Sequence, residues 1–387
     1  MTPAARVAAA IDVLDAWLAG AAAEKLLTTW GRTHRFAGSK DRAAIRDHVW
    51  EAIRCRRSFA SLGGAETGRG LMLGALRAAG QNPQTMFTGE GYAPAPLSAG
   101  EGGGPGVADL PENVALDCPD WLAPQLQASL GDDFAPVMAA LRHRAPVFLR
   151  ANLARATRDA AQAALAEEGI ESRPHPLASA ALEVTSGARR VQGSAAYQGG
   201  LVELQDAASQ AVVEALEVAN GQRVLDYCAG GGGKTLALAA QGAEVTAHDV
   251  DPRRMRDLPV RTARAGVRAA LVATDDLAKA APFDLVFADV PCSGSGAWRR
   301  SPAGKWHLTA ERLDELVAIQ ARILDEITEY VAPGGRLAYT TCSLLEAENG
   351  AQLRGFLARN PGWRRVSERR FTPLDGGDGF YVALLTR

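Results

Sequence analysis

The sequence predicts an α/β protein whose largest part is a doubly wound parallel sheet, preceded by an all-α domain and a small α+β module. From Asp206 onward, apolar runs of strand length alternate regularly with helical segments. Residues 2–80 instead place apolar side chains at helical spacing, and residues 119–200 mix helices with short strands. A stretch rich in Gly and Pro between about residues 83 and 118 has no apolar periodicity and is typical of a linker or mobile loop.

The N-terminal part is expected to be a helical domain with a basic bias. The spacing of Val7, Ile11, Leu14 and Leu18, and of Ile45, Val49 and Ile53, is helical. We expect Ser39 to cap a helix. Arginines follow at positions 42, 46, 54, 56 and 57. Residues 1–57 hold ten Lys and Arg against six Asp and Glu, which fits either a nucleic-acid-binding face or a solvated helix surface.

The middle part is predicted to be a compact α+β module of ferredoxin-like type. Helices are expected around residues 121–130, 133–142 and 157–168, with a strand at 147–150. The C-terminal part follows with strands at 223–227, 244–249, 269–273, 284–289 and 336–341, and a late pair near 363–368 and 379–385. Repeated βα units of this length imply a parallel sheet, whose ligands bind at the carboxyl ends of the strands.

Composition excludes several classes of protein. A net charge of −2 argues against a uniformly basic protein that coats nucleic acid, although it leaves room for a local basic face. Five widely spaced cysteines without a CxxC pair predict neither a disulfide framework nor a metal site. The first apolar stretch is interrupted by Asp12 and Asp15, and no run of ~18 apolar residues occurs. We therefore expect a cytoplasmic, monomeric protein without membrane or metal partners.

A glycine loop follows the first strand of the predicted sheet. Asp226 ends that strand, and Tyr227-Cys228-Ala229 leads into four glycines, Lys234 and Thr235. Glycines let the backbone approach a ligand closely, and a helix N-terminus offers free N–H groups. A phosphate-binding P-loop is excluded because Cys228 occupies the position of its first glycine.

S-adenosylmethionine fits this loop better, since it carries no phosphate. It needs a glycine turn under its methionine part and an acid after the next strand for its ribose hydroxyls. Asp249 stands at that position, and Asp275 follows the third strand, where it can reach the adenine edge. The predicted cofactor-binding residues are Cys228, Ala229, Gly230, Gly231, Gly232, Gly233, Lys234, Asp249, Asp275 and Asp289.

Two cysteines each end an apolar run that is predicted to be a strand. Cys292 lies in Asp289-Val290-Pro291-Cys292-Ser293, and Cys342 lies in Thr340-Thr341-Cys342-Ser343. Two thiols at one edge of a sheet suggest covalent catalysis. The alternative for either one is a small buried apolar residue at the end of a strand.

These motifs together resemble the Sun-type, RsmB-like family of RNA cytosine-carbon-5 methyltransferases over residues 119–387. The N-terminal residues resemble the NusB-like helical domain of the ribosomal-RNA members, mainly at residues 39–42 and the arginine-bearing helix. One departure is Gly230-Gly231, where the family usually has Ala-Pro; this loosens the turn without removing a ligand group, so we expect it to affect the affinity for the cofactor and not the cofactor's identity. The resemblance implies a NusB-like RNA-binding domain (1–82), a linker (83–118), a small α+β RNA-binding module (119–204) and an S-adenosylmethionine-dependent catalytic domain (205–387).

The resemblance also implies the roles of individual residues. Cys342 is the nucleophile that adds to carbon 6 of cytosine, and Cys292 helps to remove the carbon-5 proton or to release the product. Asp289 hydrogen-bonds ring nitrogen 3 and the exocyclic amine. The implied function is carbon-5 methylation of cytosine in RNA, with small-subunit ribosomal RNA as the expected substrate. Transfer RNA and, less plausibly, DNA stay open as substrates, and a non-catalytic ribosomal-RNA-binding assembly factor is the alternative of another class.

Further residues near the predicted site have open roles. We expect Arg299, Arg300 and Lys305 to contact RNA phosphates, whereas Lys234 is assigned to either cofactor or RNA. Trp298 and Trp306 either stack on bases or anchor their loop. A helix beginning near Leu345 is expected to favour a thiolate nearby.

Overall fold

A computed structural model describes residues 1–387, which group into two compact units. The helical unit consists of Met1–Arg144 together with Trp298–His307. The sheet unit consists of Ala145–Ala297 together with Leu308–Arg387. The domain limits at residues 82, 118 and 204 stay a prediction. No helix combines the length and apolar character needed to cross a membrane, and no cluster of His, Cys, Asp and Glu is arranged to hold a metal ion.

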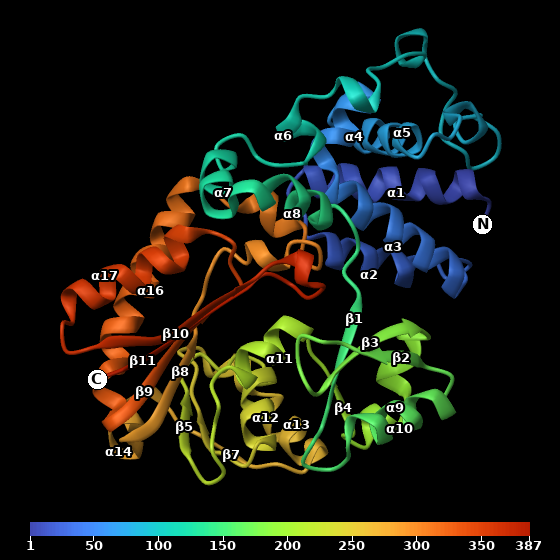
Figure 1. Cartoon of the computed structure of the whole chain (residues 1–387). Helices are drawn as coiled ribbons and strands as arrows, with labels where there is room; N and C mark the ends of the chain where they lie inside the picture. Colours follow the sequence, from blue (N-terminus) through green and yellow to red (C-terminus); the bar gives the residue numbers. More distant parts are fainter. The chain divides into compact units, whose positions relative to one another are not determined.

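The helical unit contains nine α-helices (Figure 1). They are α1 (Pro3–Leu18), α2 (Ala23–Thr33), α3 (Ser39–Arg54), α4 (Arg56–Gly63), α5 (Gly68–Ala78), α6 (Glu112–Ala115), α7 (Ala123–Leu130), α8 (Phe134–Leu141) and α15 (Ala303–His307). The predicted spacing is confirmed, because Leu14, Ile45, Val49 and Ile53 are at most 1% exposed in its core. The cap of α3 differs from the prediction: Gly38 is the N-cap, Ser39 is the first helical residue, and Asp41 accepts a hydrogen bond from the Gly38 N–H at 3.1 Å.

Residues 83–118 contain short 3₁₀ turns at Pro83–Thr85, Ala99–Glu101 and Val107–Asp109 before α6. The stretch is tied to the helical unit at several points. Phe87 is 2% exposed in the core, and Arg69 pairs with Glu101 at 2.7 Å. Asp117, fully buried, binds Ser58 and Arg142.

The sheet unit begins with a small antiparallel sheet of strand order β2-β3-β1-β4. Its elements are β1 (Val147–Ala151), α9 (Arg158–Glu167), β2 (Glu171–Pro174), β3 (Ala181–Ser186), α10 (Ala195–Gln198) and β4 (Val202–Leu204). Leu149, Leu165 and Leu182 are fully buried between sheet and helices. The α+β module predicted from the mixed pattern is therefore present.

A seven-stranded sheet of order β10-β11-β9-β8-β5-β6-β7 forms the rest of this unit. Its strands are β5 (Arg223–Asp226), β6 (Glu244–Ala247), β7 (Ala269–Leu271), β8 (Phe283–Asp289), β9 (Val331–Thr341), β10 (Arg364–Phe371) and β11 (Phe380–Thr386). Its helices are α11 (Ala207–Glu214), α12 (Gly233–Ala240), α13 (Leu258–Ala265), α14 (Leu277–Ala280), α16 (Ala310–Glu326) and α17 (Gly350–Arg359). The five strands from β9 to β7 run parallel, and β11 is antiparallel to β9. The predicted doubly wound sheet is confirmed.

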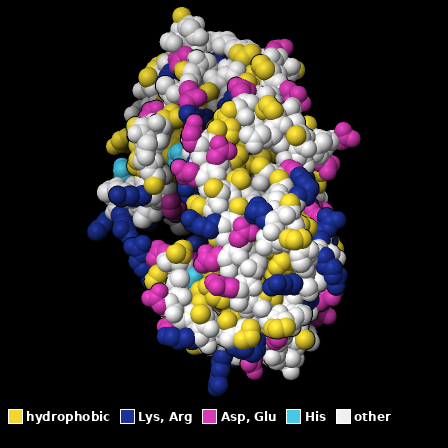
Figure 2. Space-filling view, turned by 90° about the vertical axis from the view of Figure 1, so that its left-hand side faces the viewer, with side chains coloured by type: hydrophobic (Ala, Val, Ile, Leu, Met, Phe, Trp, Pro, Cys, Tyr) yellow, Lys and Arg dark blue, Asp and Glu magenta, His cyan; other side chains and the backbone are white.

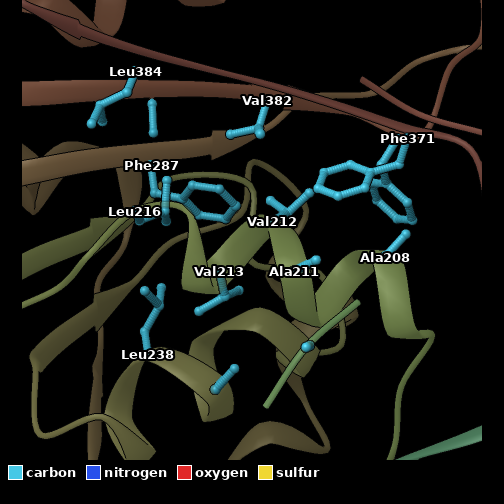
Figure 3. Packing of buried hydrophobic residues seen from close by; sticks show 14 of the residues in the cluster. Ala208, Ala211, Val212, Val213, Leu216, Leu238, Phe287, Phe371, Val382 and Leu384 are labelled. Carbon is cyan, nitrogen blue, oxygen red and sulfur yellow. The ribbon is translucent and has the colours of Figure 1, made fainter. Parts of the chain in front are cut away.

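Alternate residues of each strand bury opposite faces of this sheet, as the two-residue period of a strand requires. On one face, Phe287, Val382 and Leu384 pack against α11, whose Ala211 and Val212 point toward the strands (Figure 3). The other face is covered by α16 and α17. The chain order reverses between β5 and β8, so the carboxyl ends of these two strands form the crevice where open α/β sheets bind ligands.

Charges are mixed over the surface that Figure 2 shows, where acidic side chains lie among the basic ones. This distribution agrees with the net charge of −2. Any strongly basic region is therefore limited to a small patch of the surface.

Candidate active site

The glycine loop connects β5 to α12 through a turn that only glycines can form without strain. Gly230 has φ +52° and Gly232 has φ +80°, both in the left-handed region. A Cβ on Gly232 would also lie 2.2 Å from a Leu258 methyl group. Gly230 takes the place of the alanine that is usual in the resembled family. An alanine there would be strained, so this chain forms its own version of the turn.

A cavity of about 250 Å³ opens beside this loop at the carboxyl ends of β5 and β8. It is lined by Gln205, Ser209, Asp226, Cys228, Ala229, Gly230, Gly231, Gly233, Lys234, Arg254 and Asp289. Seven of the ten predicted cofactor-binding residues are among them. Gly232, Asp249 and Asp275 are not among the lining residues.

Asp249 supports the glycine loop from behind the cavity wall. Its carboxylate accepts hydrogen bonds from the Gly230 N–H and the Asp251 N–H, each at 3.0 Å. Arg254 pairs with the same carboxylate at 3.0 Å, and the Asp249 side chain is 1% exposed. Arg254 therefore covers the carboxylate that we predict to bind ribose. Asp275 lies on an exposed 3₁₀ turn, Thr274–Asp276.

Asp226 is a site residue that the sequence reasoning missed. Its side chain is buried, and its Oδ2 accepts a hydrogen bond from the Thr235 hydroxyl at 2.6 Å, while its Oδ1 has no partner. Burial raises the pKa of Asp226 to about 7. Its position at the end of a strand, four residues before the first glycine of the loop, was the available signal. Arg254 carried no sequence signal, because its role depends on how the loop after β6 folds back.

The small antiparallel sheet also reaches the glycine loop. Arg150 of β1 donates to the Gly233 carbonyl at 2.8 Å and also binds the Gln205 side chain, which lines the cavity. Arg150 is 7% exposed, and burial lowers its pKa to about 10. The loop is thus held from both the module and the large sheet.

The cavity has the chemistry that the predicted cofactor requires. Glycines at φ +52° and +80° leave room for close approach to the backbone. The unpartnered oxygen of Asp226 lies on a residue of the cavity wall and suits an ammonium group, such as the amino group of the methionine part of S-adenosylmethionine. We conclude that these residues fit the cofactor.

Lys234 and Asp289 form an ion pair at the same cavity. The Lys234 Nζ lies 2.5 Å from Asp289 Oδ2 and 5.0 Å from the centre of the Phe380 ring. Burial opposes the charge on Lys234, but the nearby Asp289 carboxylate outweighs it, so the pKa of Lys234 lies above its ordinary value. The cation is therefore present at neutral pH.

The two predicted cysteines lie together. Cys292 Sγ and Cys342 Sγ are 3.4 Å apart, on the loops that follow the adjacent strands β8 and β9. The hydrogen bond with Cys342, then burial, raises the pKa of Cys292 well above its ordinary value. Cys342 is also among the groups that raise the pKa of Lys234. The thiol pair and the Lys234–Asp289 pair therefore belong to one site.

The other cysteines stay protonated at neutral pH. Cys228 lines the cavity, and burial raises its pKa well above the ordinary value. In the helical unit, burial raises the pKa of Cys55 to about 12 and that of Cys118 to about 11.

The expected phosphate contacts of Arg299 and Lys305 are wrong for this structure. Both residues belong to the helical unit, with Arg299 6% and Lys305 2% exposed. Lys305 Nζ donates to the Arg54 carbonyl at 3.1 Å, and burial lowers its pKa to about 8. Arg300 alone of the three is exposed. Proximity to Cys292 in the sequence was misleading, because the chain leaves the sheet unit at residue 298.

The two tryptophans of this segment anchor it. Trp298 is 1% exposed, and Trp306 Nε1 donates to the Ile53 carbonyl at 2.6 Å. The predicted arginine face is also largely used within the helical unit. Arg46 pairs with Glu24 and Arg57 with Asp120, while Arg54 is buried against the Arg299 carbonyl.

The helix expected near Leu345 is a three-residue 3₁₀ turn, Glu346–Glu348, and α17 begins only at Gly350. A turn of this length has little dipole, so the expected helix N-terminus is absent beside Cys342.

Comparison with known proteins identifies the sheet unit. Residues 213–386 match the 16S rRNA methyltransferase RsmB/F family, and residues 118–191 match the ferredoxin-like domain of RsmF/B-like methyltransferases. The matched family is one of methyltransferases, which confirms the prediction of S-adenosylmethionine as the cofactor.

Individual relatives support the same family. The chain is 37% identical over 288 residues to the ribosomal RNA small subunit methyltransferase B of Xylella fastidiosa, covering 70% of this chain and 67% of the relative. It is 34% identical to the protein of that name from Salmonella arizonae, covering 70% of this chain and 66% of the relative. A crystal structure of a methyltransferase homologue from Pyrococcus horikoshii shares the fold, with a TM-score of 0.63 and 23% identity over 75% of this chain and 100% of that one. The resemblance seen in the sequence motifs is thus confirmed, and the chain belongs to the RsmB/F family of 16S rRNA methyltransferases.

Proposed function

We propose that this protein transfers a methyl group from S-adenosylmethionine to carbon 5 of a cytosine in RNA, with small-subunit ribosomal RNA as the substrate. One observation carries the proposal: two thiols lie 3.4 Å apart on the loops after β8 and β9, and Asp289, which ends β8, pairs with Lys234 at a cavity that fits the cofactor. When bound, S-adenosylmethionine supplies an electrophilic methyl group. Relatives that bear the name ribosomal RNA small subunit methyltransferase B support the substrate class.

The first step forms a covalent adduct. The Cys342 thiolate adds to carbon 6 of the base, and the electrons of the C5–C6 double bond move toward N3 and O2. The Lys234 ammonium donates hydrogen bonds to the edge where this charge gathers, and Asp289 accepts one from the exocyclic amine. Carbon 5 thereby becomes the nucleophilic carbon of an enamine.

The last step resolves the adduct after carbon 5 is methylated. Cys292 takes the carbon-5 proton, the electrons of the C–H bond restore the C5–C6 double bond, and the S–C6 bond breaks to release the Cys342 thiolate. The hydrogen bond with Cys342 is the largest cause of the raised pKa of Cys292. Once the sulfur of Cys342 is bonded to carbon 6, that cause is removed, and Cys292 can act as a base.

RNA must reach this site as an unpaired or flipped-out base, which requires further binding surface. The helical unit is proposed to supply it, as an RNA-binding domain over residues 1–82. Arg32, Arg35, Lys40 and Arg42 are exposed and form no ion pairs, and the neighbouring Phe36 is 75% exposed. Unpaired cations beside an exposed aromatic ring suit phosphates and a stacked base.

The RNA-binding role of the helical unit is tested by salt titration. Replacing both Arg35 and Lys40 with Ala should lower RNA affinity and reduce the slope of log affinity against log salt by about one per lost phosphate contact. Cofactor binding should be unchanged. Arg46→Ala is the matched control, because Arg46 is already paired with Glu24. An unchanged slope would assign this surface another role.

The function itself is tested by bisulfite sequencing of RNA from cells that carry the wild-type chain, the Cys342→Ala variant or neither. We expect one cytosine of small-subunit ribosomal RNA to be protected only with the wild-type chain. Protection of a cytosine in transfer RNA instead would make transfer RNA the substrate. RNA binding without protection of any cytosine would favour a non-catalytic assembly factor.

A further inference from the structure

A buried carboxylate without a cationic partner joins the two cysteine loops. Glu348 ends the 3₁₀ turn that follows Cys342, and its side chain is 0% exposed. No lysine, arginine or histidine pairs with it, although a carboxylate in such a place ordinarily requires one. It is stabilised instead by hydrogen bonds that come from two loops and one helix.

These hydrogen bonds divide between the two carboxylate oxygens. Oε2 accepts from the Ser293 hydroxyl at 2.5 Å and from the Ser343 hydroxyl. Oε1 accepts from the Ser293 N–H at 2.8 Å and from Gln320 Nε2, on α16, at 3.0 Å. Ser293 directly follows Cys292, and Ser343 directly follows Cys342. A single carboxylate thus bonds the residue next to each thiol.

The surroundings hold Glu348 itself in place. The Tyr339 hydroxyl donates to the Glu348 carbonyl at 2.6 Å, and Gln320 also donates to the Pro291 carbonyl at 2.9 Å. Ser295 bridges the two loops as well, since its hydroxyl lies 3.1 Å from that of Ser343 and accepts from the Leu344 N–H at 2.8 Å.

We propose that Glu348 is a positioning residue that holds Cys292 against Cys342, so that one thiol can resolve the adduct formed by the other. The catalytic part of this inference rests on the function proposed above, whereas the positioning part concerns the folded protein alone. The carboxylate geometry explains why a glutamate is needed. A glutamine at this position would have to turn its NH2 group toward the two hydroxyls, which would then accept instead of donate, and the strong charge-assisted hydrogen bonds of the carboxylate would be lost.

The charge of Glu348 has a second consequence for Cys292. After the hydrogen bond with Cys342 and burial, Glu348 is among the groups that raise the pKa of Cys292. The uncompensated negative charge favours a protonated Cys292, which prevents the two neighbouring thiols from competing as nucleophiles. Loss of the charge should therefore make Cys292 more reactive toward alkylating reagents at neutral pH.

The experiment measures thiol proximity without RNA. Dibromobimane becomes fluorescent when two thiols each displace one of its bromides, and peptide mass spectrometry identifies the bridged pair. We expect Glu348→Gln to slow bridging of Cys292 and Cys342 about tenfold, since small displacements strongly reduce such rates. Single alkylation of Cys292 by iodoacetamide at pH 7 should become faster. Glu346→Gln is the matched control, because Glu346 lies on the same turn but pairs with Arg354 and Arg370.

Ser343→Ala provides a milder variant in case Glu348→Gln does not fold. It removes one hydroxyl and should slow bridging about threefold, and the double variant should lose less than the product of the two effects, because both act on one network. Bridging at the wild-type rate in a folded Glu348→Gln or Ser343→Ala protein would overturn the inference.

A second experiment distinguishes failure of the proposed function from failure of the positioning role. In a Cys292→Ala background, RNA adducts should accumulate, and adding Glu348→Gln should slow their formation by no more than about threefold, because Cys342 remains near Lys234. Absence of any adduct in Cys292→Ala would reject the covalent mechanism, while slower bridging in Glu348→Gln would still support the positioning role.

Discussion

The two cysteine loops occupy equivalent places in the sheet but differ in their charged neighbours. Both thiols follow adjacent parallel strands and lie 3.4 Å apart. The loop of Cys342 adjoins the cation Lys234, which Asp289 holds in its charged form. The loop of Cys292 is bonded to the buried carboxylate of Glu348.

This difference shows how a sheet can make two identical residues unequal. A second thiol, burial and an anion together favour the protonated form of Cys292. The charges come from other strands and turns than the cysteines themselves. The proposed roles, Cys342 as nucleophile and Cys292 as later base, follow from this asymmetry.

The largest expected effect is a split between two alanine variants. Cys342→Ala should lose both methylation and adduct, by about 10³-fold or more, because no other thiol is activated beside the base. Cys292→Ala should form the adduct and then stall, giving an RNA–protein complex that survives denaturing gels. The reverse pattern would assign the nucleophile to Cys292. Full activity in both variants would remove covalent catalysis from the mechanism.

A second prediction concerns the cation beside Cys342. Lys234→Met should slow single-turnover methylation about 100-fold, since one preorganised charge at the reacting edge is lost. Lys305→Met is the matched control: that lysine is also largely buried, but it lies in the helical unit, and its replacement should leave the methylation rate within about twofold of wild type. Equal losses in both variants would contradict the assigned asymmetry.

The pH dependence of adduct resolution gives a third prediction. In the adduct the hydrogen bond with Cys342 is gone, but burial and the Glu348 carboxylate still raise the pKa of Cys292, so its thiolate becomes more abundant as the pH increases. The rate of resolution should therefore rise with pH, by up to about tenfold per unit, until Cys292 is deprotonated. Rapid-mixing pH jumps on a preformed wild-type adduct measure this rate. A rate that falls with rising pH would exclude Cys292 as the base.

Sequence patterns predicted the sheet and the chemistry of the strand ends well, because both depend on local spacing. Strand runs placed Cys292, Cys342 and Asp289 at one edge, and the structure brings them together. The positions of the strand ends do not show where the segments between the strands fold. The residues 298–307 fold into the helical unit and bury Lys305, which no periodicity in the sequence indicated.

The sequence patterns also did not reveal contacts between residues that lie far apart in the chain. Glu348 was visible only as part of a short motif, and its contacts with Ser293 and Gln320 span 55 and 28 residues of sequence. Arg254 over Asp249 depends likewise on how a loop folds back. Such contacts depend on tertiary packing, and neither propensity nor spacing encodes them.

The smallest expected effect tests whether the cofactor loop is independent of the cysteine pair. Asp249→Ala removes the acceptor of the Gly230 N–H and the proposed ribose contact, so S-adenosylhomocysteine should bind about tenfold more weakly, or ~1.4 kcal/mol. Isothermal titration calorimetry measures this change, and Asp251→Ala is the control, since Asp251 pairs only with the neighbouring Arg253 at the surface. Bridging of Cys292 and Cys342 by dibromobimane should stay at the wild-type rate in both variants, because Glu348, not the glycine loop, sets their separation. Unchanged affinity in Asp249→Ala would remove Asp249 from the cofactor site, and slower bridging would show that the loop and the thiols are coupled through Lys234, whose helix begins within the glycine loop.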